Sequence, residues 1–299
     1  MKDSSTKRLY LTFGVTLLIF FVEIIGGIIS NSLALLSDAG HVFTDSLAII
    51  LSLIASIIVK KPSGKRATYG YQKAGILAAF INGVSLIVIA GLIIFEGYRR
   101  FIKPQYIDSD VMIPIALFGF AGNITMAFIL GHKHLDLNIK SAWLHVIGDT
   151  ISSAGVILAG LTIKYTGWLL VDPIVSWFVG FIIIFGGIRV VKDSLWIFLD
   201  LVPKGFDVEE ISKEILKIKG VIDVHDIHIW SIGYGIPAFS VHVVVSVQLL
   251  SEADKIRKDI EKKIGEIGIK HSVIQIECSN CHSNNFYCKV KKVSEQGHH

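Results

Sequence analysis

The sequence predicts an α-helical membrane protein with six transmembrane helices and a C-terminal cytosolic α+β domain. Of its 299 residues, 52% are hydrophobic and only 18% are charged, whereas soluble proteins carry about 25% charged residues. The mean hydropathy is +0.60. Apolar stretches dominate the chain up to about residue 202, and after Val202-Pro203 charged residues of both signs become frequent. The chain therefore combines a polytopic membrane part with one modest soluble domain.

Six apolar stretches are long enough to cross a bilayer, since a spanning helix needs about 20 residues. Six spans place both termini on one side, and that side carries the greater share of Lys and Arg, including the basic loop at 60–66. The positive-inside bias predicts cytoplasmic termini in the plasma membrane. The expected spans are 9–29, 33–59, 74–96, 111–131, 141–163 and 168–191.

The residues after 202 alternate helical and strand patterns in the order α-β-β-α-β, which is typical of a small metallochaperone-like domain with its helices on one sheet face. Ser251 is the expected N-cap of the second helix. The chain is divided into 1–202, 203–290 and a disordered tail at 291–299. The expected elements are a helix at 208–218, strands at 224–232 and 238–247, a helix from Ser251 to about 267, and a strand at 271–277.

Two polar motifs interrupt the apolar spans, and each places a histidine four residues before an aspartate. They are His41 with Asp45 and His145 with Asp149. Residues i and i+4 lie on one helix face, so each motif presents an imidazole and a carboxylate together. A charge at the bilayer centre costs roughly 2.5–3.5 kcal/mol, which makes an intramembrane acid a candidate functional group.

One interpretation is that each histidine only hydrogen-bonds its own aspartate or a neighbouring helix. Two motifs with the same i,i+4 spacing on separate spans favour a shared cation site instead. Asp38, three residues before His41 and on the same helix face, is a further candidate ligand. Imidazole and carboxylate ligands suit tetrahedral Zn²⁺ best, and cobalt, cadmium, iron or manganese less decisively. Because the ligands must be deprotonated to bind metal, such a site would exchange metal for protons.

The soluble part carries a second candidate metal site. His225, His228 and His242 fall on expected strands and Glu277 ends another, although any single histidine there is more typical of a satisfied sheet residue. Cys278 and Cys281 form a C-x-x-C motif, which in a reducing cytosol favours metal over a disulfide. His282, His271 or Cys288 are the candidates to complete its ligand shell.

The whole pattern resembles the cation diffusion facilitator family, in its zinc-preferring branch. The His-x-x-x-Asp motifs on the second and fifth spans carry the resemblance, together with the stretches at 32–41, 69–74 and 224–230. The resemblance covers nearly the whole chain. It implies a homodimeric divalent-metal/proton antiporter that exports zinc from the cytoplasm, with a transport domain at 1–202 and a metal-binding, dimerising domain at 203–290.

The resemblance also implies roles for particular residues. It assigns the transport site to His41, Asp45, His145 and Asp149, and a cytosolic zinc site to His225, His242 and Glu277, near Cys278 and Cys281. Zinc would be both the transported substrate and a regulatory ion in the cytosolic domain. The resemblance further implies an ion pair between Lys73 and Asp200.

Three other functions compete with transport. An intramembrane metallohydrolase would need an open zinc position and a general base, commonly in an HExxH helix, and the sequence contains no such motif. A membrane-anchored metal sensor would depend on the tail rather than on Asp45. A passive zinc channel would differ only in lacking proton coupling. The net charge of +4 does not favour nucleic-acid binding, so the expected partners are divalent metal ions, protons, membrane lipid and a second copy of the chain.

Overall fold

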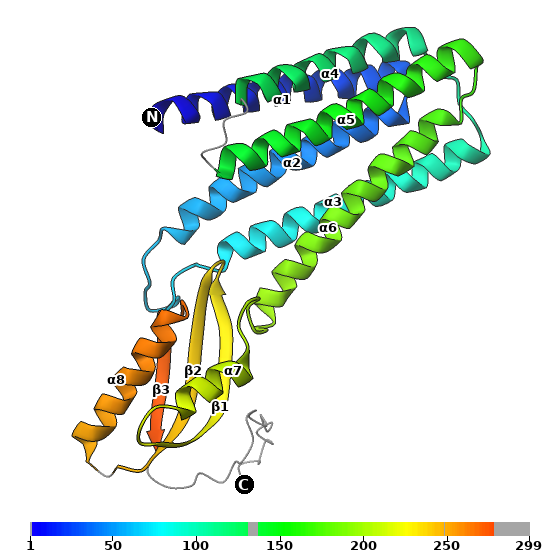
Figure 1. Ribbon diagram of the computed structural model, residues 1–299. Helices are drawn as coiled ribbons and strands as arrows, with labels where there is room; N and C mark the ends of the chain where they lie inside the picture. Colours follow the sequence, from blue (N-terminus) through cyan, green and yellow to red (C-terminus); the bar gives the residue numbers. More distant parts are fainter. Residues whose placement is uncertain (1, 131–136, 248, 278–299) are drawn as a thin grey trace, which may run out of the picture. The chain divides into compact units, whose positions relative to one another are not determined.

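The computed structural model describes residues 2–130, 137–247 and 249–277, with side chains described from residue 13 onward and, in the second stretch, from residue 146 (Figure 1). The described residues form two compact units, one made of 2–56 and 78–192 and the other of 57–77 and 193–277, with the gaps just given. Cys278, Cys281, His282 and Cys288 lie outside the described residues, as does the expected tail at 291–299.

Six described helices are long and apolar enough to cross a membrane, as the sequence predicts. Their apolar faces bury only a minority of residues inside the structure, as expected for helices whose solvent is lipid. The helices are α1 (Lys2–Ser30), α2 (Leu33–Val59), α3 (Ala74–Ile102), α4 (Ser109–Leu130), α5 (Leu137–Thr166) and α6 (Val171–Phe198).

Two of these helices end six or more residues beyond their predicted ends. α3 continues six residues past the predicted end at 96 to Ile102, and α6 continues past 191 to Phe198. In α3 the extension is supported by Glu96, whose carboxylate accepts from Arg99 at 2.9 Å and from Arg100 at 3.1 Å. Pairs at i,i+3 and i,i+4 stabilise a helix outside its apolar core, so charge does not end the helix here.

Buried polar groups tie the helices together. The Asp172 carboxylate of α6 accepts hydrogen bonds from the Ser32 hydroxyl at 2.6 Å and from the Leu33 and Ala34 amides at 2.8 and 3.1 Å. It therefore satisfies amides that the first turn of α2 leaves without an intrahelical partner. Between α4 and α5, the Asn123 amide donates to the Ser153 hydroxyl at 3.3 Å.

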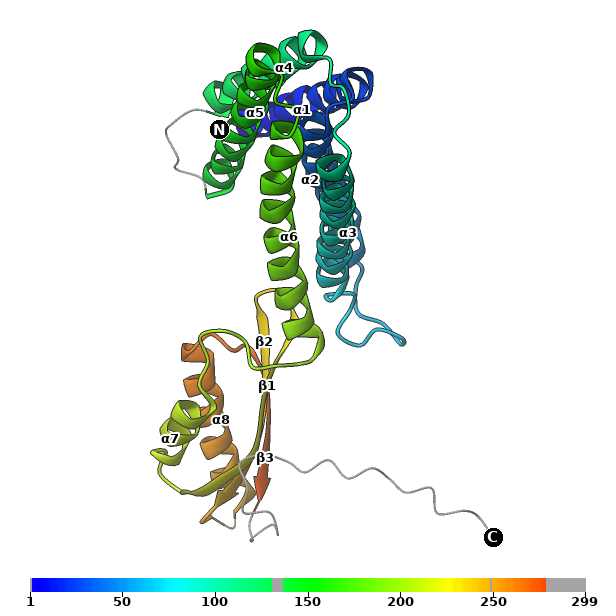
Figure 2. The same cartoon turned by 90° about the vertical axis from the view of Figure 1, so that its right-hand side faces the viewer.

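The soluble part of the second unit is a three-stranded sheet with two helices on one face (Figure 2). Strands β1 (Val221–Gly233) and β2 (Ile236–Val245) are antiparallel, and β3 (His271–Glu277) runs parallel to β2. Helices α7 (Val208–Leu216) and α8 (Leu250–Glu266) cover the sheet. The predicted order α-β-β-α-β is confirmed. The core between helices and sheet is formed by Ile211, Ile215, Val224, Ile227, Ile229, Phe239, Val241, Val243, Ile256, Ile260 and Ile264.

The predicted N-cap of α8 is wrong. The N-cap is Leu249, which has no side-chain cap hydrogen bond. Its carbonyl accepts from the amides of Glu252 and Ala253, both at 3.0 Å, so the helix has already begun when the chain reaches Ser251. In α7, by contrast, Asp207 caps the helix by accepting from the amides of Glu209 and Glu210, the arrangement that an N-cap aspartate favours.

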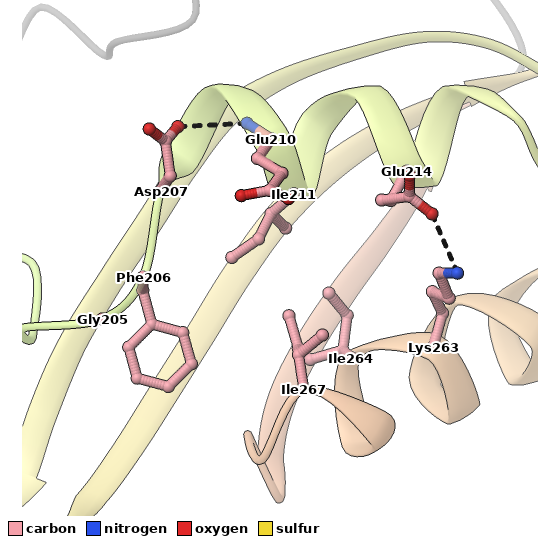
Figure 3. Close-up of a pocket in the computed structure, with 9 residues that line it drawn as sticks. All are labelled: Gly205, Phe206, Asp207, Glu210, Ile211, Glu214, Lys263, Ile264 and Ile267. Carbon is pink, nitrogen blue, oxygen red and sulfur yellow. Dashed lines mark hydrogen bonds and ion pairs between the residues drawn. The ribbon is translucent and has the colours of Figure 1, made fainter.

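Helices α7 and α8 are joined by an ion pair beside a small pocket (Figure 3). The Glu214 carboxylate contacts the Lys217 ammonium at 2.5 Å and the Lys263 ammonium of α8 at 2.8 Å. These hydrogen bonds lower the pKa of Glu214 from 4.5 to about 2. The carboxylate therefore stays ionised, and bound to α8, at acidic pH.

Replacing Glu214 should make the α7–α8 contact less dependent on pH. Since the folded-state pKa is depressed, the stabilisation is present above pH 4.5 and is lost as the pH falls toward 2. We expect Glu214→Gln to exchange α7 amide hydrogens faster than wild type near neutral pH, with the difference shrinking below pH 4. Hydrogen exchange at matched pH values measures it, and a constant difference down to pH 2 would contradict this assignment.

Candidate metal centres

The first candidate centre lies within the helical unit, where α2 and α5 meet. His41 Nε2 lies 3.8 Å from Asp45 Oδ2 and 3.6 Å from Asp149 Oδ1. One ligand atom from each of the three residues falls within 4.8 Å of the others. These separations exceed a hydrogen bond and suit groups arranged around a common ion. Asp149 is 8% exposed, and all three residues stand within apolar spans.

The contacts between α2 and α5 show that the two helices run antiparallel at this level. Asp38 contacts Ser152 and Ser153, whereas His41, one turn further along α2, contacts Asp149, one turn earlier on α5. If the antiparallel pairing continues for one more helical turn, the backbone of residue 145 on α5 lies opposite Asp45 on α2. His145 lies on α5, but its side chain is outside the described part of the structure.

Asp38 has a different role from the ligand group. Its two carboxylate oxygens accept from the hydroxyls of Ser152 at 2.7 Å and Ser153 at 2.9 Å, and the residue is 3% exposed. Asp38 is not among the described residues that converge as candidate ligands. Its hydrogen bonds join α2 to α5 one turn from His41.

A pocket of about 430 Å³ opens onto this centre. His41 and Asp149 line it together with residues of α5 and α6, from Gly148 to Gly155 and from Val175 to Ile183. The end of α5 and the start of α6 are joined by the turn at 167–170. Higher residue numbers on α5 and lower residue numbers on α6 therefore lie closer to this turn. The pocket therefore extends from the site toward that turn.

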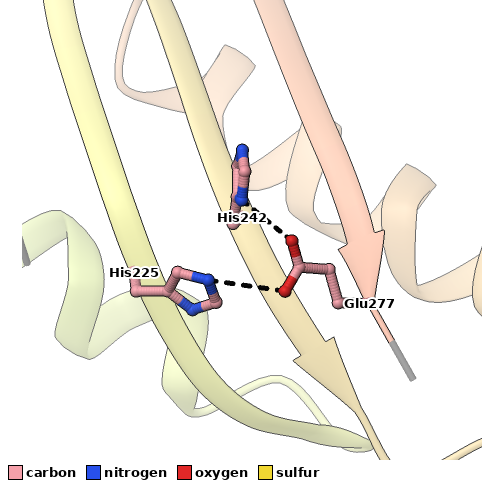
Figure 4. Close-up of side chains that lie close together, drawn as sticks. All are labelled: His225, His242 and Glu277. Carbon is pink, nitrogen blue, oxygen red and sulfur yellow. Dashed lines mark ion pairs between the residues drawn. The ribbon is translucent and has the colours of Figure 1, made fainter. Parts of the chain in front are cut away.

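The second candidate centre lies on the face of the sheet that points away from α7 and α8 (Figure 4). His225 of β1 and His242 of β2 are directly paired across the strands, and Glu277 ends the neighbouring β3. Glu277 Oε2 lies 3.4 Å from His225 Nε2, and Glu277 Oε1 lies 2.8 Å from His242 Nδ1. The three side chains come together from three strands, and one ligand atom from each lies within 4.8 Å of the others.

A β-bulge at Asp226 creates this arrangement. Asp226 has φ +52° and sits where the β1–β2 register shifts between His225 and His228. Without the extra residue, strict alternation would turn Ile227 away from the core that Val224 occupies. With it, Val224 and Ile227 both face the helices while His225 faces the open side.

Asp226 also belongs to the surroundings of the centre, which reasoning from the sequence missed. Its carboxylate lies 3.1 Å from His228 Nε2 and 3.5 Å from His242 Nε2. His242 is therefore contacted by a carboxylate on each ring nitrogen. The sequence does place an acidic residue between two histidines, in His225-Asp226-Ile227-His228. Because the whole stretch matches a strand pattern, nothing in it predicts the bulge that brings Asp226 close to His242.

His271, the candidate for a ligand shell around Cys278 and Cys281, lies away from this centre. His271 begins β3 and is paired with Ala238, six residues along the strand from Glu277. At about 3.3 Å per residue this separates the two positions by roughly 20 Å, so His271 does not belong to the group of His225, His242 and Glu277. Its ring instead meets Tyr69 edge-on, with centroids 5.5 Å apart. Cys278 and Cys281 follow Glu277 in sequence and remain predictions.

The expected ion pair of Lys73 with Asp200 is confirmed. The Lys73 ammonium donates to the Asp200 carboxylate at 2.9 Å, joining the segment before α3 to the segment after α6 within one compact unit. Asp200 has φ +51°, a backbone conformation that aspartate tolerates better than most residues. The chain turns here to leave α6 for the soluble domain.

Taken together, the fold and its two clusters define an integral membrane protein with candidate divalent-metal ligands inside its spans and on an attached soluble domain. The family model described as the cation efflux transmembrane domain matches residues 9–199, and the one described as the cation efflux protein cytoplasmic domain matches 203–279. The chain belongs to the cation efflux family, the cation diffusion facilitators, and is a transporter.

Relatives resemble this chain over nearly its full length. A cadmium, cobalt and zinc/H⁺-K⁺ antiporter of Bacillus velezensis is 39% identical, over 99% of this chain and 96% of its own. The zinc transporter ZitB of Escherichia coli is 35% identical, over 100% and 95%. The metal cation efflux system protein CzcD of Cupriavidus metallidurans is 34% identical, over 92% and 87%.

Proposed function

We propose that this transporter exports zinc from the cytoplasm in exchange for protons, by alternating access at His41, Asp45, His145 and Asp149. The observation that carries the proposal is the convergence of His41, Asp45 and Asp149 within apolar spans. The position of residue 145 on the antiparallel α5 supports a fourth ligand. Two imidazoles and two carboxylates fit a closed tetrahedral shell and balance the charge of Zn²⁺. The names of the Bacillus velezensis and Escherichia coli relatives both include zinc.

Proton exchange follows from the chemistry of the ligands. A histidine or aspartate must lose its proton before it binds a metal ion, so zinc and protons compete for one site. When the site faces a more acidic compartment, protons displace the metal. When it faces the cytoplasm, zinc displaces the protons. Alternation between these two states couples the downhill entry of protons to the export of zinc.

The pocket at the transport site gives the candidate ligands His41 and Asp149 an opening between α5 and α6. The excess of Lys and Arg on the side of the termini favours cytoplasmic termini, which puts the α5–α6 turn on the opposite side of the plasma membrane. The pocket extends from Asp149 toward that turn. Packed side chains, among them Leu35, Val156 and Val175, lie between the pocket and that turn, so an outward-facing state must open a path past them.

The cytosolic centre fits a regulatory zinc ion. His225 is 3% exposed, and neither of its ring nitrogens has a hydrogen-bond partner among the described residues. A buried imidazole with both nitrogens unsatisfied is costly, and a metal ion held with His242 and Glu277 would remove that cost for one nitrogen. Cys278 and Cys281 are the candidate additional ligands.

Zinc at the cytosolic centre would favour a homodimer prepared for transport. Such an effect requires that the two arrangements of the domain differ in affinity for the metal. In this proposal residues 1–202 carry out transport and residues 203–290 sense cytosolic zinc and dimerise. Membrane lipid is the solvent of the first part, and nucleic acid has no role.

Zinc flux into proteoliposomes tests the proposal. With an imposed pH gradient and equal zinc on both sides, we expect zinc to accumulate in the more acidic compartment. The accumulation should stop when a protonophore collapses the gradient. Cadmium, cobalt, manganese and iron(II), tested in parallel, rank the substrates. Zinc that only equilibrates, with no dependence on the pH gradient, would establish a passive channel and rule out antiport.

A further inference from the structure

The segment between α2 and α3 forms one wall of a large pocket that the transport mechanism does not use. Its volume is about 880 Å³. Its walls come from the end of α2, the segment up to the start of α3, the end of α6 and strand β1, all within the second compact unit. Lys61, Arg66, Tyr71 and Trp230 are among the residues that line it.

This segment is strongly cationic and mostly without counter-charges. Residues 60–73 contain five Lys or Arg side chains and no Asp or Glu. Lys73 is paired with Asp200. In the described part of the chain no ion pair involves the other four cations, all of which are exposed: Lys60, Lys61, Lys65 and Arg66.

Backbone hydrogen bonds order the segment that carries Lys65 and Arg66. Gly64 and Ala67 exchange backbone hydrogen bonds of 3.0 and 3.1 Å in an antiparallel bridge. This tight turn leaves Lys65 and Arg66 at its tip, and Arg66 lines the pocket. Further backbone bonds, from Gly70 to Ala67 and from Ala74 to Tyr71, continue the ordered path into α3.

The pocket lies at the level of the membrane surface. Ile58, in the last turn of α2, and Leu77, in the first turn of α3, both line it, and both belong to candidate membrane spans. Tyr69 and Tyr71 are exposed beside them, and tyrosine favours the boundary between lipid and water. Apolar walls therefore continue into the bilayer where the cationic groups begin.

We propose that this pocket binds the phosphate headgroup of an anionic phospholipid, with Lys61 and Arg66 contacting the phosphate. The acyl chains would run along the exposed side chains at the ends of α2 and α3. Clusters of Lys and Arg beside a span attract the anionic lipids of the cytoplasmic leaflet, where the orientation proposed above places this segment. A small soluble anion would contact only the cationic part of the pocket, whereas a phospholipid would contact the apolar wall as well.

Lipid binding by purified full-length protein in a nonionic detergent tests the assignment. The protein is titrated with phosphatidylglycerol, phosphatidylcholine or inorganic phosphate, and bound molecules are counted by native mass spectrometry. At roughly 1 kcal/mol for each cation, Lys61→Gln with Arg66→Gln should weaken phosphatidylglycerol binding roughly 30-fold. The charge-conserving exchange of Lys61→Arg with Arg66→Lys should largely retain it.

A matched control removes the same charge elsewhere. Lys255 and Lys262 are exposed on α8 and have no ion pair with a described residue, so Lys255→Gln with Lys262→Gln should bind phosphatidylglycerol as wild type does. Equal loss in both double variants would overturn the site, as would unchanged binding in the Lys61/Arg66 variant. Equal binding of phosphatidylcholine would overturn the charge argument, and binding of inorganic phosphate as tight as that of the lipid would overturn the choice of lipid.

Discussion

Asp149→Asn is expected to abolish proton-driven zinc transport. The substitution keeps the size of the side chain but removes the negative charge that lies 3.6 Å from His41 Nε2. Loss of a group that only orients a metal ligand costs about 10–100-fold in affinity, so loss of a ligand should cost at least about 100-fold. The amide also cannot carry a proton across the membrane. Zinc flux in proteoliposomes under a pH gradient measures both effects.

A chemically matched control separates this effect from general damage to the helices. Asp110 is exposed at the start of α4 and is paired with Lys164 at the end of α5. Asp110→Asn makes the same change outside the site and should leave transport within about two-fold of wild type, since exposed ion pairs contribute roughly 0–1 kcal/mol. Zinc transport by Asp149→Asn at the rate of this control would refute the site.

His145 provides a second check of the same centre. If residue 145 lies opposite Asp45 and supplies the fourth ligand, His145→Ala should lose as much zinc flux as His41→Ala. A variant that retained flux would show that the centre is completed by another group. Isothermal titration of zinc into the detergent-solubilised variants distinguishes lost binding from lost conformational exchange.

The second large effect concerns the cytosolic centre. His242→Ala together with Glu277→Gln removes the imidazole and the carboxylate that lie 2.8 Å apart. Only His225 of the three candidate ligands then remains. We expect the variant to lose one equivalent of bound zinc for each chain, with affinity falling at least about 100-fold. The measurement is best made in the Asp149→Asn background, where the transport site no longer contributes.

His271→Ala is the control for the cytosolic centre. It removes one histidine from the same strand as Glu277, at the opposite end, where the ring contacts Tyr69. Zinc binding should be unchanged in this variant. If His271→Ala lost the zinc and the His242/Glu277 variant kept it, the centre would lie elsewhere on the domain. If both kept it, the described triad would not be the site.

Hydropathy was sufficient to predict the helical unit because lipid imposes a single requirement on every span. About 20 consecutive apolar residues are needed to cross the bilayer, and little else in a sequence has that length. The boundaries were less predictable. Glu96 with Arg99 and Arg100 extends α3 beyond its apolar stretch, and such pairs depend on helical spacing that composition does not register.

The separate roles of the acidic residues could not be assigned from their positions alone. Asp38, Asp45, Asp149 and Asp172 are all acids within apolar sequence. In the structure, Asp172 caps the first turn of α2 and Asp38 binds two serines of α5. Only Asp45 and Asp149 turn toward His41. Which acid finds a hydroxyl or amide depends on the neighbouring helix, and so on tertiary packing.

The sequence by itself determined a polytopic membrane protein, its six spans, the order of the soluble elements and the i,i+4 motifs, because these follow from local periodicity and composition. The tertiary structure alone decided which candidate ligands meet. His225, His242 and Glu277 converge because a bulge at Asp226 changes the phase of β1 and because β3 pairs with β2 in parallel. Both are properties of strand pairing between distant segments, and the free energy that selects the register comes from burial of Ile227 and its neighbours against α7 and α8.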